Sequence, residues 1–210
     1  MTTTVVVAGG PDPPRSFELP PGARVIAADG GVAVAAQLGL PVDLVVGDLD
    51  SGSAAEGVEV ERHAPDKDAS DLELALNAAV RLGTERLVVV SGVGGRLDHL
   101  LGTLLLLARD AHAPVTVDAQ LGEAAAHVIR GARALTGEPG DIVSLFAVHG
   151  AATGVTTEGL RYPLDEETLE TGSSRGLSNV FDGPEARVSV RSGVLVAVRP
   201  RGSAWAASAP

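Results

Sequence analysis

Acidic residues follow short apolar segments of the chain, at a spacing that suits metal chemistry. Asp48 and Asp50 are one residue apart after the apolar run 43–46, and Asp71 ends a further acidic stretch. On an extended segment, side chains two residues apart point to the same side, so both carboxylates can share one hard divalent cation. A third carboxylate nearby favours this prediction, because clustered carboxylates repel one another without a cation or a proton. A simple turn is the alternative for 48–50.

A glycine-rich segment after another apolar run has the composition of an anion-binding loop. Its small residues are Ser91, Gly92, Gly94 and Gly95. Glycines let backbone N–H groups approach a ligand, and Arg96 adds a fork that matches phosphate oxygens. Asp98 follows at a predicted helix start, where it could cap the helix, accept a substrate proton or bind a cationic group. A glycine-rich turn with a capping Asp is the alternative. The P-loop pattern is absent, because no lysine follows the glycines.

Lys67, the only lysine of the sequence, lies between Asp66 and Asp68. It is either an ordinary solvated charge or a phosphate contact opposite Arg96, and the residues alone leave both open.

The histidines lack metal-ligand spacing. His99 lies in the glycine-rich segment and stays open, whereas the others are interpreted as surface or structural: His63, His112, His127 and His149.

The elements that position these residues are predicted from unbroken apolar runs. Runs without alternation are typical of strands buried on both faces; they span 5–8, 24–28, 43–46 and 86–90. Helices are predicted over 32–38, 71–82 and 100–110, the second with a capping box of Ser70 and Glu73. This order predicts an open, mainly parallel α/β sheet. Ligands of such sheets bind beyond the carboxyl ends of the strands, where Asp29 also lies.

From about residue 115 the pattern changes to short alternating strands, such as 187–190 and 194–198, separated by turn signals. This pattern predicts a small antiparallel β-sandwich domain. We therefore expect two domains, an α/β domain over 1–120 and a β-sandwich domain over 121–210.

Composition excludes several classes of protein. With 210 residues, 45% hydrophobic and 20% charged, the chain should form a globular core. It contains no cysteine, which excludes disulfides, thiolate metal sites and a cysteine nucleophile. A net charge of -11 disfavours general nucleic-acid binding. No apolar run reaches the length of a membrane span, and no signal-peptide pattern opens the chain. We expect a soluble, cytoplasmic protein.

Taken together and in order, these motifs resemble the thiamine pyrophosphokinase (thiamine diphosphokinase) family. The matching pieces span 28–31, 43–51, 67–73, 94–99, 155–164 and 178–179. The resemblance implies an ATP- and magnesium-binding α/β domain, a thiamine-binding and dimerisation β-sandwich, and a homodimer with active sites between subunits. It implies transfer of the diphosphate of ATP to the hydroxyl of thiamine, which releases AMP.

The resemblance also assigns roles to residues. Magnesium would be held by Asp48, Asp50 and Asp71. The ATP side would comprise Lys67, Ser91, Gly92, Gly94, Gly95 and Arg96. The thiamine side would comprise Asp29, Asp98, Tyr162, Ser178 and Asn179. The catalytic residues would be Asp71, Asp98 and Arg96, and either Asp98 or a metal-site aspartate could take the hydroxyl proton.

Some positions depart from the family pattern. Ala33 and Thr103 stand where the family often has Asn, Leu49 where it has Phe, and Val180 where it has Glu. None of these departures removes a predicted metal ligand. Two other functions remain: a magnesium-dependent nucleotide-sugar enzyme or phosphohydrolase, which also uses paired aspartates, and a thiamine or nucleotide sensor without turnover.

Overall fold

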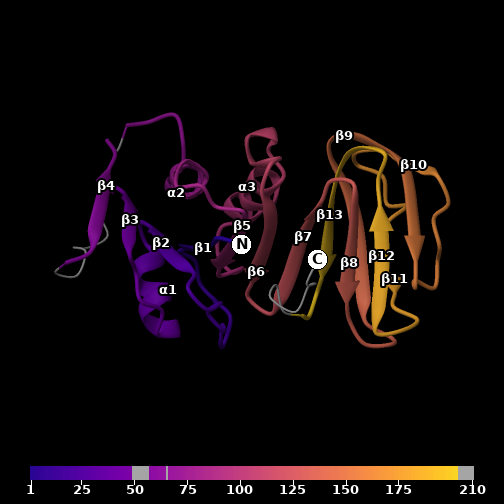
Figure 1. Ribbon diagram of the computed structural model, residues 1–210, viewed down its shortest axis with the longest axis horizontal. Coiled ribbons are helices and arrows are strands. Elements are labelled where there is room, and N and C mark those ends of the chain that lie inside the picture. The colour runs from indigo at the N-terminus through magenta and orange to yellow at the C-terminus, as the bar shows by residue number, and fades with distance from the viewer. Residues whose placement is uncertain (49–56, 65, 203–210) are drawn as a thin grey trace. The chain divides into compact units, whose positions relative to one another are not determined.

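The computed structural model describes residues 1–48, 57–64 and 66–202 (Figure 1). The chain divides into two compact units. The first contains Met1–Leu106 and Pro114–Gly122, and the second contains Leu107–Ala113 and the residues from Glu123 on. The assignment of ATP to the first predicted domain and of thiamine to the second stays a prediction at this point.

The first unit contains a parallel sheet with the strand order β4-β3-β2-β1-β5-β6. The strands are β1 Thr3–Ala8, β2 Arg24–Ala28, β3 Leu44–Gly47, β4 Glu59–Arg62, β5 Arg86–Ser91 and β6 Thr116–Leu121. Successive residues of β1 and β5 are fully buried without alternation, as expected of strands covered on both faces. The predicted parallel α/β domain is therefore confirmed.

Three α-helices accompany this sheet in the described part of the chain: α1 Gly31–Leu38, α2 Asp71–Arg81 and α3 Leu97–Leu107. The capping box at α2 is confirmed on one side, because Ser70 Oγ accepts a hydrogen bond from Glu73 N–H at 3.2 Å. The predicted bounds 100–110 of the third helix were wrong. Gly95 has a φ of +83°, so the helix can begin as soon as the glycine-rich turn ends.

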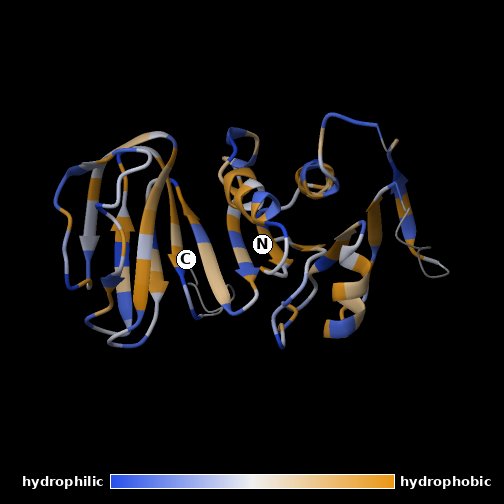
Figure 2. Cartoon of the chain, turned by 180° about the vertical axis from the view of Figure 1, so that it is seen from behind, coloured by the Kyte–Doolittle hydropathy of each residue, from blue (hydrophilic) through white to orange (hydrophobic). Residues whose placement is uncertain are grey.

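The second unit is built from antiparallel strands. They are β7 Ala124–Ile129, β8 Ala132–Thr136, β9 Ile142–Glu158, β10 Glu167–Leu169, β11 Asn179–Val180, β12 Glu185–Ser189 and β13 Ser192–Arg199. The long β9 pairs with four of them along its length: β10, β11, β12 and β13. Their inner side chains form one core that includes Leu135, Leu145, Phe181 and Leu195. Figure 2 shows the apolar stretches of both units in orange. The predicted antiparallel β domain is confirmed.

Candidate active site

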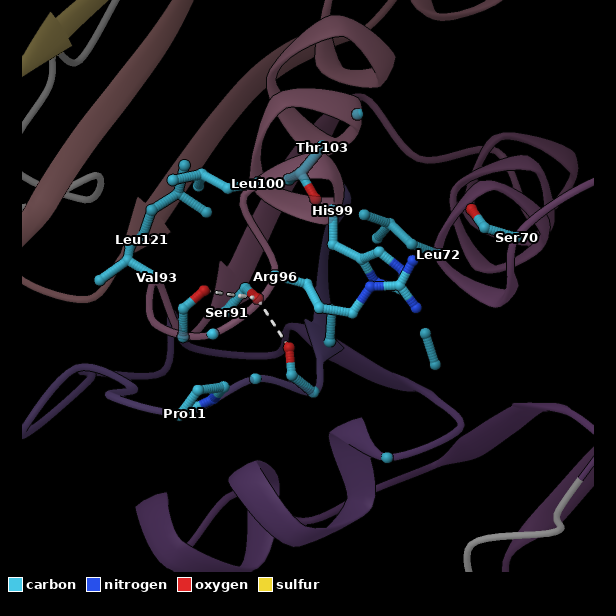
Figure 3. A pocket seen from close by; sticks show the side chains of 18 of the residues that line it. Pro11, Ser70, Leu72, Ser91, Val93, Arg96, His99, Leu100, Thr103 and Leu121 are labelled. Carbon is cyan, nitrogen blue, oxygen red and sulfur yellow. Dashed lines mark hydrogen bonds between the residues drawn. The ribbon is translucent and has the colours of Figure 1, made fainter.

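A cavity of about 710 Å³ opens at the carboxyl ends of the parallel strands of the first unit. Its walls come from the segments that follow β1, β2 and β5, from the start of α2 and from one face of α3 (Figure 3). It brings together many residues that the sequence predicted: Asp29, Asp71, Ser91, Gly92, Gly94, Gly95, Arg96 and Asp98. Asp48 and Lys67 lie beside Asp71 but outside the cavity wall.

The glycine loop, residues 92–95, packs backbone to backbone against the segment after β1. A Cβ atom at Gly92 would lie 2.1 Å from the carbonyl oxygen of Pro11 and 2.5 Å from that of Gly10. Only glycine allows this approach. Ser91 Oγ donates to the carbonyl oxygen of Gly9 at 3.0 Å, which ties the two segments together (Figure 3).

Sequence reasoning did not select residues 9–11 as part of the site. The available signal was the pair Gly9 and Gly10 at the end of the first strand. Glycines at the end of β5 predict a ligand-binding loop, and the same argument applies to this pair. Thr103, noted only as a departure, lines the cavity, as do Leu72 and Leu121 from other elements. The open question about His99 is answered in part, because its side chain lies at the cavity (Figure 3).

Arg96 and Asp98 form a forked ion pair at this cavity. Arg96 Nε is 3.2 Å from Asp98 Oδ1 and Nη2 is 2.5 Å from Oδ2. The hydrogen bonds from Arg96 lower the pKa of Asp98 from 3.8 to about 2, with smaller contributions from the charge of Arg96 and from backbone N–H groups. Both side chains are well exposed, 69% and 64%. Asp98 therefore stays anionic at neutral pH, and Arg96 is free to exchange partners at little cost.

A second group of charges lies where β3 ends and α2 begins. Lys67 Nζ is 2.8 Å from Asp71 Oδ1 and 3.9 Å from Asp48 Oδ2. The pKa of Lys67 is raised, chiefly by the short contact with Asp71 and further by the charges of Asp71, Asp48 and Asp29. We call the three carboxylates Asp29, Asp48 and Asp71, together with Lys67, the carboxylate cluster. The Lys67 side chain is 16% exposed and contacts two carboxylates, which favours a paired charge over an ordinary solvated one.

Gly47 lets the carboxylates of this cluster come together. A Cβ atom there would lie 3.0 Å from Asp29 Cβ and 3.2 Å from Asp71 Oδ1, at a φ of +155°. A side chain at this position would force Asp29 and Asp71 to shift away from the end of β3. The sequence thus places a glycine between the two carboxylates that it must bring close.

The carboxylate cluster fits a hard cation by its donor chemistry. Oδ1 of Asp71 is buried, and its partner within the described residues is a cation, the Lys67 ammonium at 2.8 Å. Oxygen donors of this kind are those that Mg²⁺ prefers. Asp50, the third predicted ligand, lies outside the described residues. Within the residues described, no three His, Cys, Asp or Glu side chains are grouped closely enough to hold a metal by themselves.

The predicted thiamine-side residues of the second unit form one locally bonded turn. Asn179 Oδ1 accepts from Tyr162 N–H at 3.0 Å, and Asn179 Nδ2 donates to the Tyr162 carbonyl at 2.7 Å. Ser178 has a φ of 56°, and its N–H donates to Ser144 Oγ at 3.1 Å. Tyr162 is 55% exposed. Asn179 therefore fixes the backbone that carries Tyr162, and the direct roles of these residues toward thiamine stay predictions.

The remaining histidines agree with a structural interpretation where the structure describes them closely. His112 and His127 are buried at 1% and 0% exposure, and His63 Nε2 is 2.9 Å from Glu61 Oε1. No helix in the described part of the chain has the length and apolar character that a membrane span requires.

Two family models match the chain in succession. The thiamin pyrophosphokinase catalytic domain matches residues 22–117, and the thiamin pyrophosphokinase vitamin B1 binding domain matches residues 127–195. Thiamine pyrophosphokinase from Bacillus subtilis (strain 168) is 26% identical over 220 residues, covering 95% of this chain and 99% of the relative.

Solved structures share the fold. A crystal structure of thiamine pyrophosphokinase from Bacillus subtilis superposes with a TM-score of 0.81 at 22% identity, covering 96% of this chain and 100% of that chain. Thiamin pyrophosphokinase from Candida albicans gives a TM-score of 0.71 at 13% identity, covering 94% of this chain and 88% of that chain. By the two family models, which together span most of its length, this chain belongs to the thiamine pyrophosphokinase family.

Proposed function

We propose that this chain is a thiamine diphosphokinase, which transfers the diphosphate of ATP to the hydroxyl of thiamine and releases AMP. One observation carries the proposal. The catalytic model matches the unit that holds the cavity, and the vitamin B1 binding model matches the antiparallel unit that follows it. A catalytic region and a vitamin-binding region in one chain favour an enzyme that acts on the vitamin over a general nucleotide-sugar enzyme.

The phosphates of ATP would bind at the glycine loop. Its backbone can approach a ligand closely, because Gly92 and its neighbours carry no side chains. Arg96 would exchange Asp98 for phosphate oxygens, which offer the same two-point geometry to its guanidinium. Lys67 adds a positive charge near the start of α2.

Magnesium would be held by Asp48 and Asp71, with Asp50 as the third predicted ligand. When bound, the ion would neutralise charge on the phosphate oxygens during transfer. The chain's own residues do the positioning: Gly47 sets the spacing of the carboxylates, and α2 fixes Asp71 in its first turn. Attack of a hydroxyl on phosphorus gains most from such positioning and charge neutralisation.

Thiamine is a cation, so carboxylates suit its binding. Asp29 and Asp98 both line the cavity, and Asp98 is ionised at neutral pH, with a pKa that Arg96 lowers to about 2. A carboxylate with so low a pKa is a weak proton acceptor while the pair lasts. The hydroxyl oxygen would form a bond to the β-phosphorus as the bond from this phosphorus to the oxygen of AMP breaks, and either Asp98 or a metal-site aspartate would take the hydroxyl proton.

The second unit would complete the thiamine site through Tyr162, Ser178 and Asn179, contributed by the other subunit of a homodimer. The dimer is tested by gel filtration with light scattering at assay concentration. We expect twice the chain mass of 21.2 kDa. A peak at the mass of one chain would contradict the dimer.

The activity is tested by incubating the purified chain with ATP, Mg²⁺ and thiamine and separating the products. Equal amounts of thiamine diphosphate and AMP support the proposal. ADP with thiamine monophosphate would move the attack to the γ-phosphorus, and thiamine binding without turnover would favour a sensor. Asp66→Asn is a matched control for Asp71→Asn, because both remove one acidic charge and Asp66 is exposed.

A further inference from the structure

An ammonium group occupies the centre of the carboxylate cluster. Lys67 Nζ contacts Asp71 Oδ1 at 2.8 Å and lies 3.9 Å from Asp48 Oδ2. The side chains of Lys67, Asp48 and Asp71 are only 16%, 15% and 27% exposed. Shielding from water strengthens the attraction between these charges. The cluster is therefore held together by a cation that belongs to the chain itself.

The contact with Asp71 restricts what else this carboxylate can bind. Magnesium lies about 2.0–2.1 Å from its oxygen ligands. A metal ion on Oδ1 of Asp71 would therefore lie beside the ammonium that already contacts this oxygen, and the two positive charges would repel each other. This repulsion weakens the contact between Lys67 and Asp71 when a divalent cation binds the same oxygen, and it favours movement of the ammonium away from the metal.

The chemistry of lysine suits a displaceable cation. Of the 16 basic residues in the sequence, Lys67 is the only lysine. Its ammonium is a compact point charge on a flexible stem, whereas arginine presents a flat, rigid fork. The contrast appears within this unit, because Arg96 grips Asp98 with two nitrogen atoms and Lys67 reaches Asp71 with one.

We propose that Lys67 is a positioning residue that fills the cation position of the carboxylate cluster in the metal-free chain and leaves it when a divalent cation binds. Before metal arrives, Lys67 keeps Asp48 and Asp71 close despite their repulsion. After metal arrives, the ammonium stays tethered at the start of α2 and is available to phosphate oxygens. The proposal rests on the proposed function for the identity of the metal as Mg²⁺.

The single lysine allows a direct test on the unmodified chain. Isotopic labelling of lysine gives one side-chain NMR signal, that of Lys67. Titration with MgCl₂ in the absence of nucleotide should shift this signal in a saturable way toward the position of a solvent-exposed lysine. KCl at matched ionic strength should leave it in place. A Lys67 signal that does not move during the MgCl₂ titration overturns the proposal.

Substitution provides a second test, with Mn²⁺ binding followed by electron paramagnetic resonance and no nucleotide present. Lys67→Met removes the competing charge, so the affinity for Mn²⁺ should rise about tenfold or more. Arg81→Met is the matched control. It also removes one positive charge, but Arg81 lies at the other end of α2 and pairs with Glu61. Lys67→Arg keeps the charge, so it should not show this rise in affinity.

Each outcome of this test is decisive. If Lys67→Met binds Mn²⁺ no more tightly than the wild type, the proposal is overturned, even if the variant is less stable or binds ATP poorly. If the variant does not fold, the NMR titration of the wild type decides. Failure of the proposed function is separate, because it would appear as a wild-type chain that forms no AMP while its Lys67 signal still responds to MgCl₂.

Discussion

The acidic and the glycine-rich parts of the same sheet edge are built by opposite means. In the carboxylate cluster, oppositely charged side chains contact one another with little exposure to water, and the Lys67 side chain is only 16% exposed. In the glycine loop, backbone lies against backbone at Gly92, and the charges beside it, Arg96 and Asp98, stand 69% and 64% exposed. The first part holds its charges away from water, and the second places an exposed ion pair beside a close backbone contact.

This difference suits two different ligands. Shielded charges interact strongly, so the carboxylate cluster can discriminate among cations. Exposed charges are screened by water and salt, so Arg96 can exchange Asp98 for a phosphate at little cost. We therefore expect substitutions in the cluster to act on metal binding and chemistry, and substitutions at the loop to act on shape and on ATP affinity.

Asp71→Asn should have the largest effect. It removes the charge that contacts Lys67 and is predicted to hold magnesium, so kcat/KM should fall about 10³-fold. The measurement is AMP formation over a range of Mg²⁺ concentrations, with Asp66→Asn as the control. Activity of Asp71→Asn close to that of the control would remove Asp71 from the metal site.

Gly92→Ala should disrupt the backbone packing of the glycine loop. The new Cβ atom would clash with the carbonyl oxygens of Pro11 and Gly10, at 2.1 and 2.5 Å. We expect a loss of about 3 kcal/mol in the free energy of unfolding, measured by urea denaturation. Gly102→Ala is the matched control, because Gly102 also lines the cavity, yet a Cβ atom there meets no described atom within 4 Å outside its own stretch of helix.

The control has an expected result of its own. Gly102 lies inside α3, and Ala is a better helix former than Gly, so Gly102→Ala should stabilise the chain by about 0.5–1 kcal/mol. If both variants lost stability equally, the close approach of the two loops would not be the cause.

Local patterns made much of this edge predictable from sequence. Unbroken apolar runs located the strands that end at the cavity, and Ser70 with Glu73 located the start of α2. Strand β4 was missed, because Glu59–Arg62 is a polar edge strand with no apolar run. Edge strands are only half covered and leave a weaker signal in the sequence.

Long-range contacts were the part that sequence could not supply. The partner of Gly92 is a segment more than 80 positions earlier in the chain, and no local pattern indicates which loop it contacts. The position of Lys67 between Asp71 and Asp48 likewise depends on how β3 and α2 pack. Sequence left Lys67 between two interpretations, and its contacts with Asp71 and Asp48 favour a paired charge over an ordinary solvated one.

Arg96→Ala should raise the KM for ATP about 10²-fold, since the variant loses the fork that is proposed to hold phosphate. The melting temperature should not change measurably, because the pair with Asp98 is exposed. Arg81→Ala, another exposed arginine of the same unit, should leave the KM unchanged. A fall in melting temperature with an unchanged KM would show that Arg96 acts on the fold and not on the nucleotide.

The smallest effect concerns the titration of Asp98. Its pKa in the folded chain is about 2, below the ordinary 3.8, so the contribution of the pair to stability is complete above about pH 4 and is lost as the pH falls through about 2, where half of the Asp98 carboxyls are protonated. Arg96→Ala should raise this pKa most of the way to the ordinary value, as followed by NMR of the labelled carboxyl carbon. Backbone N–H groups at the start of α3 also lower the pKa of Asp98, so a small lowering of this pKa should persist.

A pKa that stays near 2 in Arg96→Ala would mean that the helix terminus, and not Arg96, lowers the pKa of Asp98. The exposed pair would then not influence the pKa of Asp98, whereas the less exposed contact with Asp71 raises the pKa of Lys67. The difference between the two regions would be larger than the pair with Arg96 now indicates.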